Sequence, residues 1–173
     1  MAFFFNAKKY LKEEKEMAIK YTVNKHTVCH PGNLIAQNYG EHMVSLGITE
    51  DTDNGRIVKV GDMQSLDNYK VEKATTIGAT IFDQNADGTW LVVVTSVPDD
   101  LTALVYTEPL IAEESPRALT SIANFYNDPE DGAARGYILH ALDRFSLSAD
   151  GFEGTPKKGA KITTITDGKL VVA

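Results

Sequence analysis

The chain has 173 residues, of which 43% are hydrophobic and 24% charged, and this composition is typical of a globular protein with one domain of ordinary size and an added arm. Its formal net charge of −7 argues against general binding to nucleic acid, because a surface that follows phosphates needs a basic patch. No apolar run approaches the roughly 18 residues of a membrane span, so we expect neither membrane insertion nor an export signal. The single cysteine, Cys29, excludes an intramolecular disulfide.

The first 20 residues are predicted to form a separate N-terminal arm. Residues 7–19 are rich in strong helix formers and contain neither glycine nor proline, which predicts a helix. Residues 1–25 hold six lysines and three glutamates, so a net charge of +3 stands against −10 in the remainder. The apolar stripe of this helix is too thin to stabilise it alone. We therefore expect the arm to dock on another subunit, although a solvated helix end packed on its own domain is the alternative. The predicted contact residues are Phe3, Phe4, Phe5, Tyr10 and Leu11.

Residues 21–173 are predicted to form a β-rich domain. Residues 21–29 alternate as a strand does and end at a turn at 30–33, and residues 34–46 fit a short helix that Gly40 weakens. Asp53-Asn54-Gly55 and Ala86-Asp87-Gly88 have the residues of tight hairpin turns that need positive φ. The strand at 56–60 alternates and is predicted to be half-buried. The strand at 90–94 is almost wholly apolar and is predicted to be covered on both faces.

Further strands are predicted at 69–71, 101–106, 136–139, 144–147 and 161–165, with a last hairpin at 167–168 leading into 169–172. Residues 115–126 fit a helix with proline at its first position, or equally a strand. Residues 127–132 are predicted to be a surface loop. The whole pattern indicates a mainly β protein, an antiparallel sandwich or barrel-like domain with an N-terminal helical arm and little other helix. A subdivision near 110–135 stays open.

One turn resembles the start of a calcium loop. Asp83, Asn85, Asp87 and Gly88 match the first ligand positions of an EF-hand, but Val94 stands where that loop needs its bidentate glutamate. Strands also replace the expected flanking helices. An ordinary hairpin turn is the favoured interpretation.

Two histidine groups suggest other chemistry. His26, Cys29 and His30 are close in sequence, but soft-metal sites need three or four convergent ligands and no second cysteine exists. His140 and Asp143 have the spacing of a general base and the group that orients it, which leaves a small hydrolase as a remote alternative. No serine lies in a G-x-S-x-G motif. We expect no enzyme, no metal and no cofactor.

Glycine- and turn-dominated patterns from about Gly55 onward resemble accessory structural proteins of tailed-phage heads, over about two thirds of the chain. The residues that carry the resemblance are Asn54, Gly55, Val58 and Gly61 in the first turn region, followed by Arg135, Tyr137, Leu139, Asp143, Phe145, Ser148, Phe152, Gly154, Gly159 and Gly168. The chain departs from the pattern at Leu142, where the resemblance leads us to expect glycine before aspartate.

The resemblance implies a non-enzymatic virion structural protein, a capsid decoration protein of a bacteriophage. Such a protein would be made in the host cytoplasm and would bind the exterior of the capsid, where it stabilises the head. Its expected partners are the major capsid protein and further copies of itself, a trimer among the options, with no direct contact to nucleic acid or membrane. The alternative role is a head-fibre base or a host-surface, glycan-binding adhesin that uses loops such as 127–132.

Overall fold

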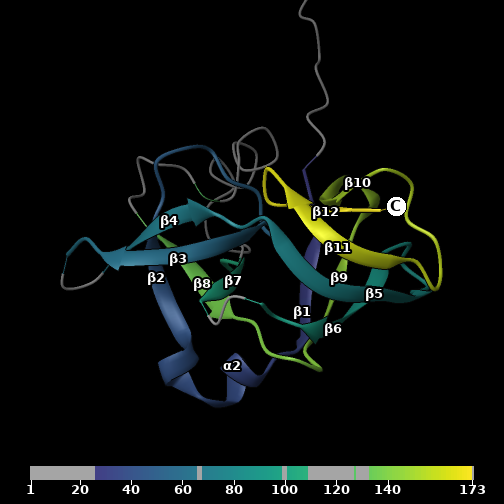
Figure 1. Cartoon of the computed structure of the whole chain (residues 1–173), viewed down its shortest axis with the longest axis horizontal. Helices are drawn as coiled ribbons and strands as arrows, with labels where there is room; N and C mark the ends of the chain where they lie inside the picture. Colours follow the sequence, from purple (N-terminus) through teal and green to yellow (C-terminus); the bar gives the residue numbers. More distant parts are fainter. Residues whose placement is uncertain (1–25, 66–67, 99–100, 109–126, 128–132, 173) are drawn as a thin grey trace, which may run out of the picture.

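The computed structural model describes residues 26–65, 68–98, 101–108, 127 and 133–172, and these residues form a mainly β structure with little helix (Figure 1). The predicted fold class is confirmed. The arm predicted at residues 1–20 lies outside the described residues, as does the ambiguous segment 115–126.

The described strands form one open sheet and one closed barrel. The seven-stranded sheet contains, in spatial order, β1 (Cys29–Asn33), β9 (Arg144–Leu147), β6 (Trp90–Ser96), β5 (Thr76–Gln84), β11 (Lys161–Thr166), β12 (Lys169–Val171) and β10 (Phe152–Glu153). The barrel contains, in spatial order, β2 (Met43–Gly47), β4 (Tyr69–Lys73), β3 (Ile57–Met63), β7 (Thr102–Val105) and β8 (Ala134–Ile138). Pairing is antiparallel except between β2 and β4 and between β10 and β12. Figure 1 shows the barrel and the open sheet side by side.

Each sheet has its own hydrophobic core, and β3 contributes to both. Ile57 belongs to the core of the seven-stranded sheet, whereas Val58 and Val60 belong to the core of the barrel. Because consecutive side chains of a strand point to opposite faces, a strand between two cores buries both of its faces. The prediction of a half-buried strand is therefore wrong at the start of β3, where Ile57 and Val58 are both buried.

Strand β6 shows the opposite error. Val92 and Val94 are fully buried, but Leu91 and Val93 on the other face are partly exposed. An apolar run predicts coverage of both faces, and here only one face is covered by the core. The outer face of the seven-stranded sheet therefore carries apolar side chains that water reaches.

The two predicted glycine turns differ in role. Gly88 has φ +87° in the turn between β5 and β6, which confirms that hairpin. Gly55 has φ +86°, as a tight turn requires, but it does not close a hairpin, because the preceding strand β2 pairs with β4 and β8. A Cβ atom at Gly55 would lie 2.6 Å from Leu147 Cδ2. The turn at Gly55 thus packs into the core.

The N-terminal part of the domain departs most from the prediction. Residues 30–33, predicted as a turn, belong to β1, and residues 26–28, predicted as strand, are not strand. Pro31 is tolerated there because β1 lies at the edge of the sheet and its register shifts between His30 and Asn33. The predicted helix at 34–46 is reduced to a single turn, α2 (Ile35–Asn38), and a 3₁₀ turn, η1 (Gly40–His42), before β2 begins. A second 3₁₀ turn, η3 (Ala149–Gly151), precedes β10.

The remaining strand predictions are confirmed as β4, β7, β8, β9, β11 and β12. The predicted surface loop at 127–132 is wrong at its first residue, because Asn127 is buried and pairs with Thr52; residues 128–132 lie outside the described part. Among the described residues no helix has the length and apolar character needed to cross a bilayer.

Candidate functional site

The contact residues predicted from the sequence, Phe3, Phe4, Phe5, Tyr10 and Leu11, lie outside the described residues. The other candidate groups lie within the residues that the structure describes.

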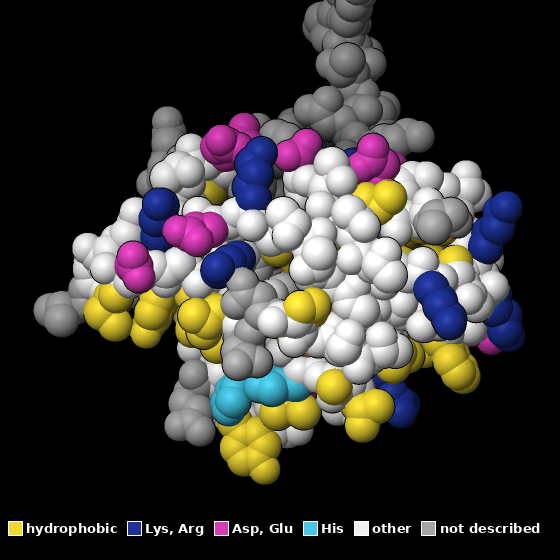
Figure 2. All heavy atoms as spheres, viewed as in Figure 1, with side chains coloured by type: hydrophobic (Ala, Val, Ile, Leu, Met, Phe, Trp, Pro, Cys, Tyr) yellow, Lys and Arg dark blue, Asp and Glu magenta, His cyan; other side chains and the backbone are white. Residues whose placement is uncertain are grey.

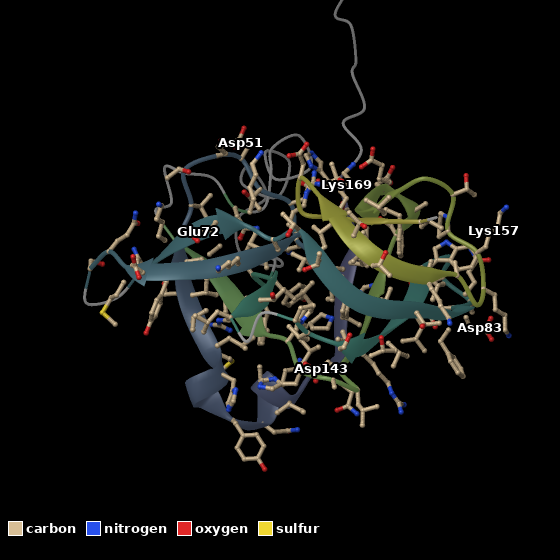
Figure 3. The ribbon with its side chains drawn as sticks, viewed as in Figure 1. Asp51, Glu72, Asp83, Asp143, Lys157 and Lys169 are labelled. Atoms are coloured by element: carbon tan, nitrogen blue, oxygen red, sulfur yellow. The ribbon has the colours of Figure 1, made fainter. Side chains whose placement is uncertain are left out.

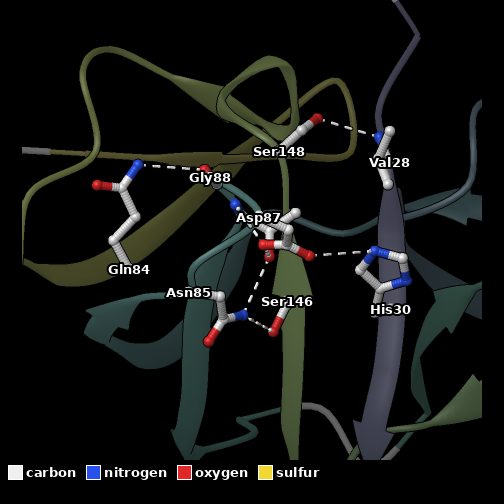
Figure 4. Close-up of polar contacts among 9 residues, drawn as sticks. Val28, His30, Gln84, Asn85, Asp87, Gly88, Ser146 and Ser148 are labelled. Atoms are coloured by element: carbon white, nitrogen blue, oxygen red, sulfur yellow. Dashed lines mark hydrogen bonds and ion pairs between the residues drawn. The ribbon is translucent and has the colours of Figure 1, made fainter.

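In the turn that resembles a calcium loop, Asp87 serves the turn itself (Figure 4). Its Oδ1 accepts hydrogen bonds from the Thr89 backbone N–H at 2.9 Å and the Thr89 hydroxyl at 2.6 Å. These bonds hold the pKa of the Asp87 carboxyl below its usual value. Its other oxygen lies 3.7 Å from His30 Nε2 on β1. Asp87 therefore closes the hairpin and faces the edge strand.

The neighbouring side chains of this turn point to separate partners. Asn85 Nδ2 donates to Ser146 Oγ at 2.9 Å, and Asp83 Oδ2 accepts from Lys158 Nζ at 2.7 Å. The hydrogen bond from Lys158 lowers the pKa of Asp83. The Asp83 and Asn85 side chains are therefore engaged with different residues of the protein. The segment forms the turn between β5 and β6, as the favoured interpretation of an ordinary hairpin turn predicts.

His26, Cys29 and His30 do not come together. His26 Nδ1 lies 2.8 Å from Asp53 Oδ1, and His30 faces Asp87 instead. Cys29 is buried in the core, and this burial raises the pKa of its thiol to about 12. Within the part of the chain that the structure describes, no three His, Cys, Asp or Glu side chains are placed to hold a metal ion.

Asp143 is a buried structural anchor. Its Oδ1 accepts from the Ile35 backbone N–H at 2.8 Å, and its Oδ2 accepts from the His140 backbone N–H at 2.7 Å. The His140 ring nitrogen Nδ1 is 3.9 Å from Oδ2, beyond hydrogen-bond reach. His140 and Asp143 therefore lie close together, but the ring and the carboxylate are not hydrogen-bonded as a general base and its orienting group would be. The carboxylate, however, holds backbone groups and ties α2 to the turn before β9.

This anchor assembles an exposed face that the sequence did not reveal. We use the name α2 face for Ile35, Tyr39, His42 and Met43 of one segment together with His140 and Leu142 of the turn that Asp143 and the His42–His140 ring contact join to it. Its four large apolar members are exposed, with Tyr39 at 60% and Leu142 at 76%. Figure 2 shows histidine side chains among hydrophobic ones at the lower edge of the view, where Figure 1 places α2, and Figure 3 shows Asp143 beside that helix.

Aromatic contacts order the α2 face. The His42 and His140 rings meet edge-on with their centroids 4.7 Å apart, and the Tyr39 ring lies 6.2 Å from that of His42. Side chains held by such contacts lose little conformational freedom on binding. An ordered set of aromatic and aliphatic side chains is typical of the anchors in protein interfaces.

Leu142 is held in an unfavourable backbone conformation on this face, with φ +76°. Leucine rarely adopts the left-handed region, which glycine enters freely. This is the position at which the phage-protein resemblance led us to expect glycine, so the turn keeps the glycine geometry. The departure at Leu142 marks this turn in the sequence, but it indicates no exposed face.

No protein-family model, curated protein or solved structure matches the chain.

Proposed function

We propose that the chain is a non-enzymatic structural protein of a virion, which binds the capsid exterior and stabilises or decorates the head. The observation that carries the proposal is that four glycines of the sequence resemblance have positive φ and that two of its polar residues, Asn54 and Asp143, are buried anchors.

Four of the five glycines of the resemblance occupy backbone conformations that favour glycine, and Gly61 is the exception. Gly55, Gly154, Gly159 and Gly168 all have positive φ, between +76° and +96°. Any chain with glycines at these spacings can form turns with the same left-handed backbone conformation. Leu142 adds a fifth position with a glycine-like φ where the resemblance leads us to expect glycine, and this agreement supports the proposal.

Two polar residues of the resemblance, Asn54 and Asp143, are buried anchors. Asn54 exchanges two hydrogen bonds with the backbone of Thr107, at 2.8 and 2.9 Å, and its Oδ1 also accepts from Asn127 Nδ2 at 3.2 Å. Asp143 holds α2 as described above. Buried polar groups with full sets of partners specify one arrangement of the chain.

The α2 face supplies a surface for the proposed contact with the major capsid protein. It is apolar and aromatic, and its members come from two segments that Asp143 holds together. Burial of Tyr39 and Leu142, which are 60% and 76% exposed, would provide hydrophobic binding energy. The arm residues Phe3, Phe4, Phe5, Tyr10 and Leu11 remain a separate predicted contact.

The proposal is tested by co-sedimentation of the purified chain with heads of the encoding phage assembled without it. The chain should pellet with the heads, and the double variant Tyr39→Ser, Leu142→Ser should bind at least about tenfold more weakly. The matched control is Met63→Ser, which removes an apolar side chain 57% exposed on β3, away from the α2 face. Absence of the chain from the pellet would refute the proposal. Equal binding by the wild type and both variants would show that the contact with the head does not involve the α2 face.

A further inference from the structure

The outer face of the seven-stranded sheet carries an apolar strip between cations. Register pairs place Lys161 beside Thr80, Thr80 beside Val93, and Val93 beside Arg144, so these four side chains form one row across β11, β5, β6 and β9. Directly paired residues point to the same face of a sheet. Lys161 and Arg144 are exposed at the two ends of this row, and neither has an ion-pair partner among the described residues.

Phe82 lies next to this row and is 62% exposed. Ile81 before it is fully buried, and the register of β5 against β6 shifts between Ile81 and Asp83, so Phe82 is directed outward. Leu91, the partner of Asp83 in the next pair, is partly exposed on the same side. We call Phe82, Leu91, Val93, Arg144 and Lys161 the sheet face.

An acidic groove lies at another part of the surface, where the barrel strands β3 and β4 meet the turn before β12. It has a volume of about 320 Å³, and its lining includes the apolar side chains of Ile48 and Val71. Exposed Glu50 and Asp51 also line it, and neither carboxylate has a cationic partner among the described residues. We call this the acidic groove.

The basic residues that line the groove are already engaged with Asp167. Arg56 Nη1 donates to the Asp167 backbone oxygen at 2.8 Å, and Lys73 Nζ lies 3.1 Å from the Asp167 carboxylate. Lys73 is therefore paired with the Asp167 carboxylate, whereas Arg56 keeps its positive charge, because a backbone carbonyl does not neutralise a guanidinium. The lining still holds more carboxylates than cations, with Glu50, Asp51, Glu72 and Asp167 against Arg56 and Lys73. The groove thus offers two carboxylates that have no ion-pair partner among the residues that the structure describes, beside an apolar lining.

The sheet face and the acidic groove are complementary and lie apart. One presents an exposed aromatic ring with two cations, and the other presents a hollow with apolar lining and two carboxylates. None of these four charged groups has an ion-pair partner within the described part of the chain. Figure 3 shows Asp51 and Glu72 toward one end of the long axis and Asp83 and Lys157 at the other end, and Figure 2 shows basic side chains gathered at that second end. One molecule therefore cannot satisfy both surfaces by itself.

We propose that copies of this chain associate head to tail, with the sheet face of one copy seated in the acidic groove of the next. Phe82 enters the groove, and Arg144 and Lys161 face Glu50 and Asp51 of the neighbouring copy. Such a contact joins two different surfaces, so it generates a ring when the rotation closes and an open chain when it does not. The inference does not depend on what the α2 face binds.

The first test measures the mass of the full chain by sedimentation velocity over a concentration series at low and high salt. Wild type should form species larger than a monomer, and these should weaken as salt rises because the paired charges are exposed. Phe82→Ser and Arg144→Glu should each raise the dissociation constant at least about tenfold. The matched control Arg135→Glu reverses an exposed arginine on β8, outside both surfaces, and should leave association unchanged.

The second test separates head-to-tail pairing from other self-association. The double variants Arg144→Glu, Lys161→Glu and Glu50→Lys, Asp51→Lys should each be monomeric, because each has lost one of its two surfaces. Their mixture should associate again, since the first keeps an intact acidic groove and the second an intact sheet face. Thermal melting of each variant establishes that these exposed substitutions leave the fold intact.

Three results would overturn the inference. The first is a wild-type chain that stays monomeric at all concentrations. The second is that the charge-reversed variants fold and still associate as the wild type does. The third is that the mixture of the two double variants remains monomeric.

Discussion

Removal of the Asp143 carboxylate is the sharpest test of how the α2 face is built. Asp143→Ala deletes the acceptor of two hydrogen bonds, from the Ile35 and His140 backbone N–H groups at 2.8 and 2.7 Å. Hydrogen bonds to a charged group contribute about 1.5–3 kcal/mol each, and because both donors are only part-buried we take about 1–2 kcal/mol for each bond. The free energy of unfolding should therefore fall by about 2–4 kcal/mol, which corresponds to roughly 4–16 °C in melting temperature for a domain of this size.

The assay is urea denaturation followed by circular dichroism, with binding to heads measured on the same preparations. Asp143→Asn keeps one acceptor oxygen and should lose about half as much stability. Asp62→Ala removes an exposed carboxylate on β3 and should change stability by no more than about 0.5 kcal/mol. A loss below about 1 kcal/mol for Asp143→Ala would refute the anchoring role. Full head binding by a folded Asp143→Ala variant would show that docking does not need the ordered α2 face.

Three further predictions concern backbone geometry and the thiol. Gly55→Ala should lower the free energy of unfolding by about 2–4 kcal/mol, because strain at φ +86° adds to a clash with Leu147. Gly88→Ala, at φ +87°, brings its new Cβ within 4 Å of no other atom and should lower the free energy of unfolding by only about 1 kcal/mol. Equal losses for the two variants in urea titrations would contradict this reasoning. Leu142→Gly should raise the free energy of unfolding by up to about 1 kcal/mol through relief of its left-handed conformation, and a marked loss would disprove that strain. Cys29 should resist thiol reagents until the chain unfolds. The free energy of unfolding should fall as pH rises above 9.0, because the Cys29 thiol of the unfolded chain then loses its proton while the native thiol keeps it to about pH 12. Cys29→Ala should remove that part of the pH dependence.

The fold class could be predicted because its signals are local. Alternating and apolar runs of four to nine residues, separated by glycine turns, specify strands wherever they lie in the chain. The edge strand β1 was missed because Pro31 and Gly32 are typical of turns, and only a position at the edge of a sheet permits them in a strand. Edge positions depend on strand order, which the local pattern does not contain.

The α2 face could not be predicted because it depends on contacts between distant parts of the chain. Ile35 and Asp143 are 108 residues apart in sequence and are joined by one hydrogen bond. Asn127 was placed in a surface loop on its composition, but it is buried because its side chain bonds Thr52 and Asn54. In each case a polar side chain that is usual in loops serves a long-range contact, and nothing in the neighbouring residues indicates its partner.

The central claim, that the chain is a capsid decoration protein, is tested most directly by cryo-electron microscopy of native heads from the encoding phage. Density for the barrel and the seven-stranded sheet is expected on the outer surface at a regular lattice position, with the α2 face against the major capsid protein. Heads that lack this density would contradict the claim. Density with the α2 face directed to solvent would contradict the proposed contact.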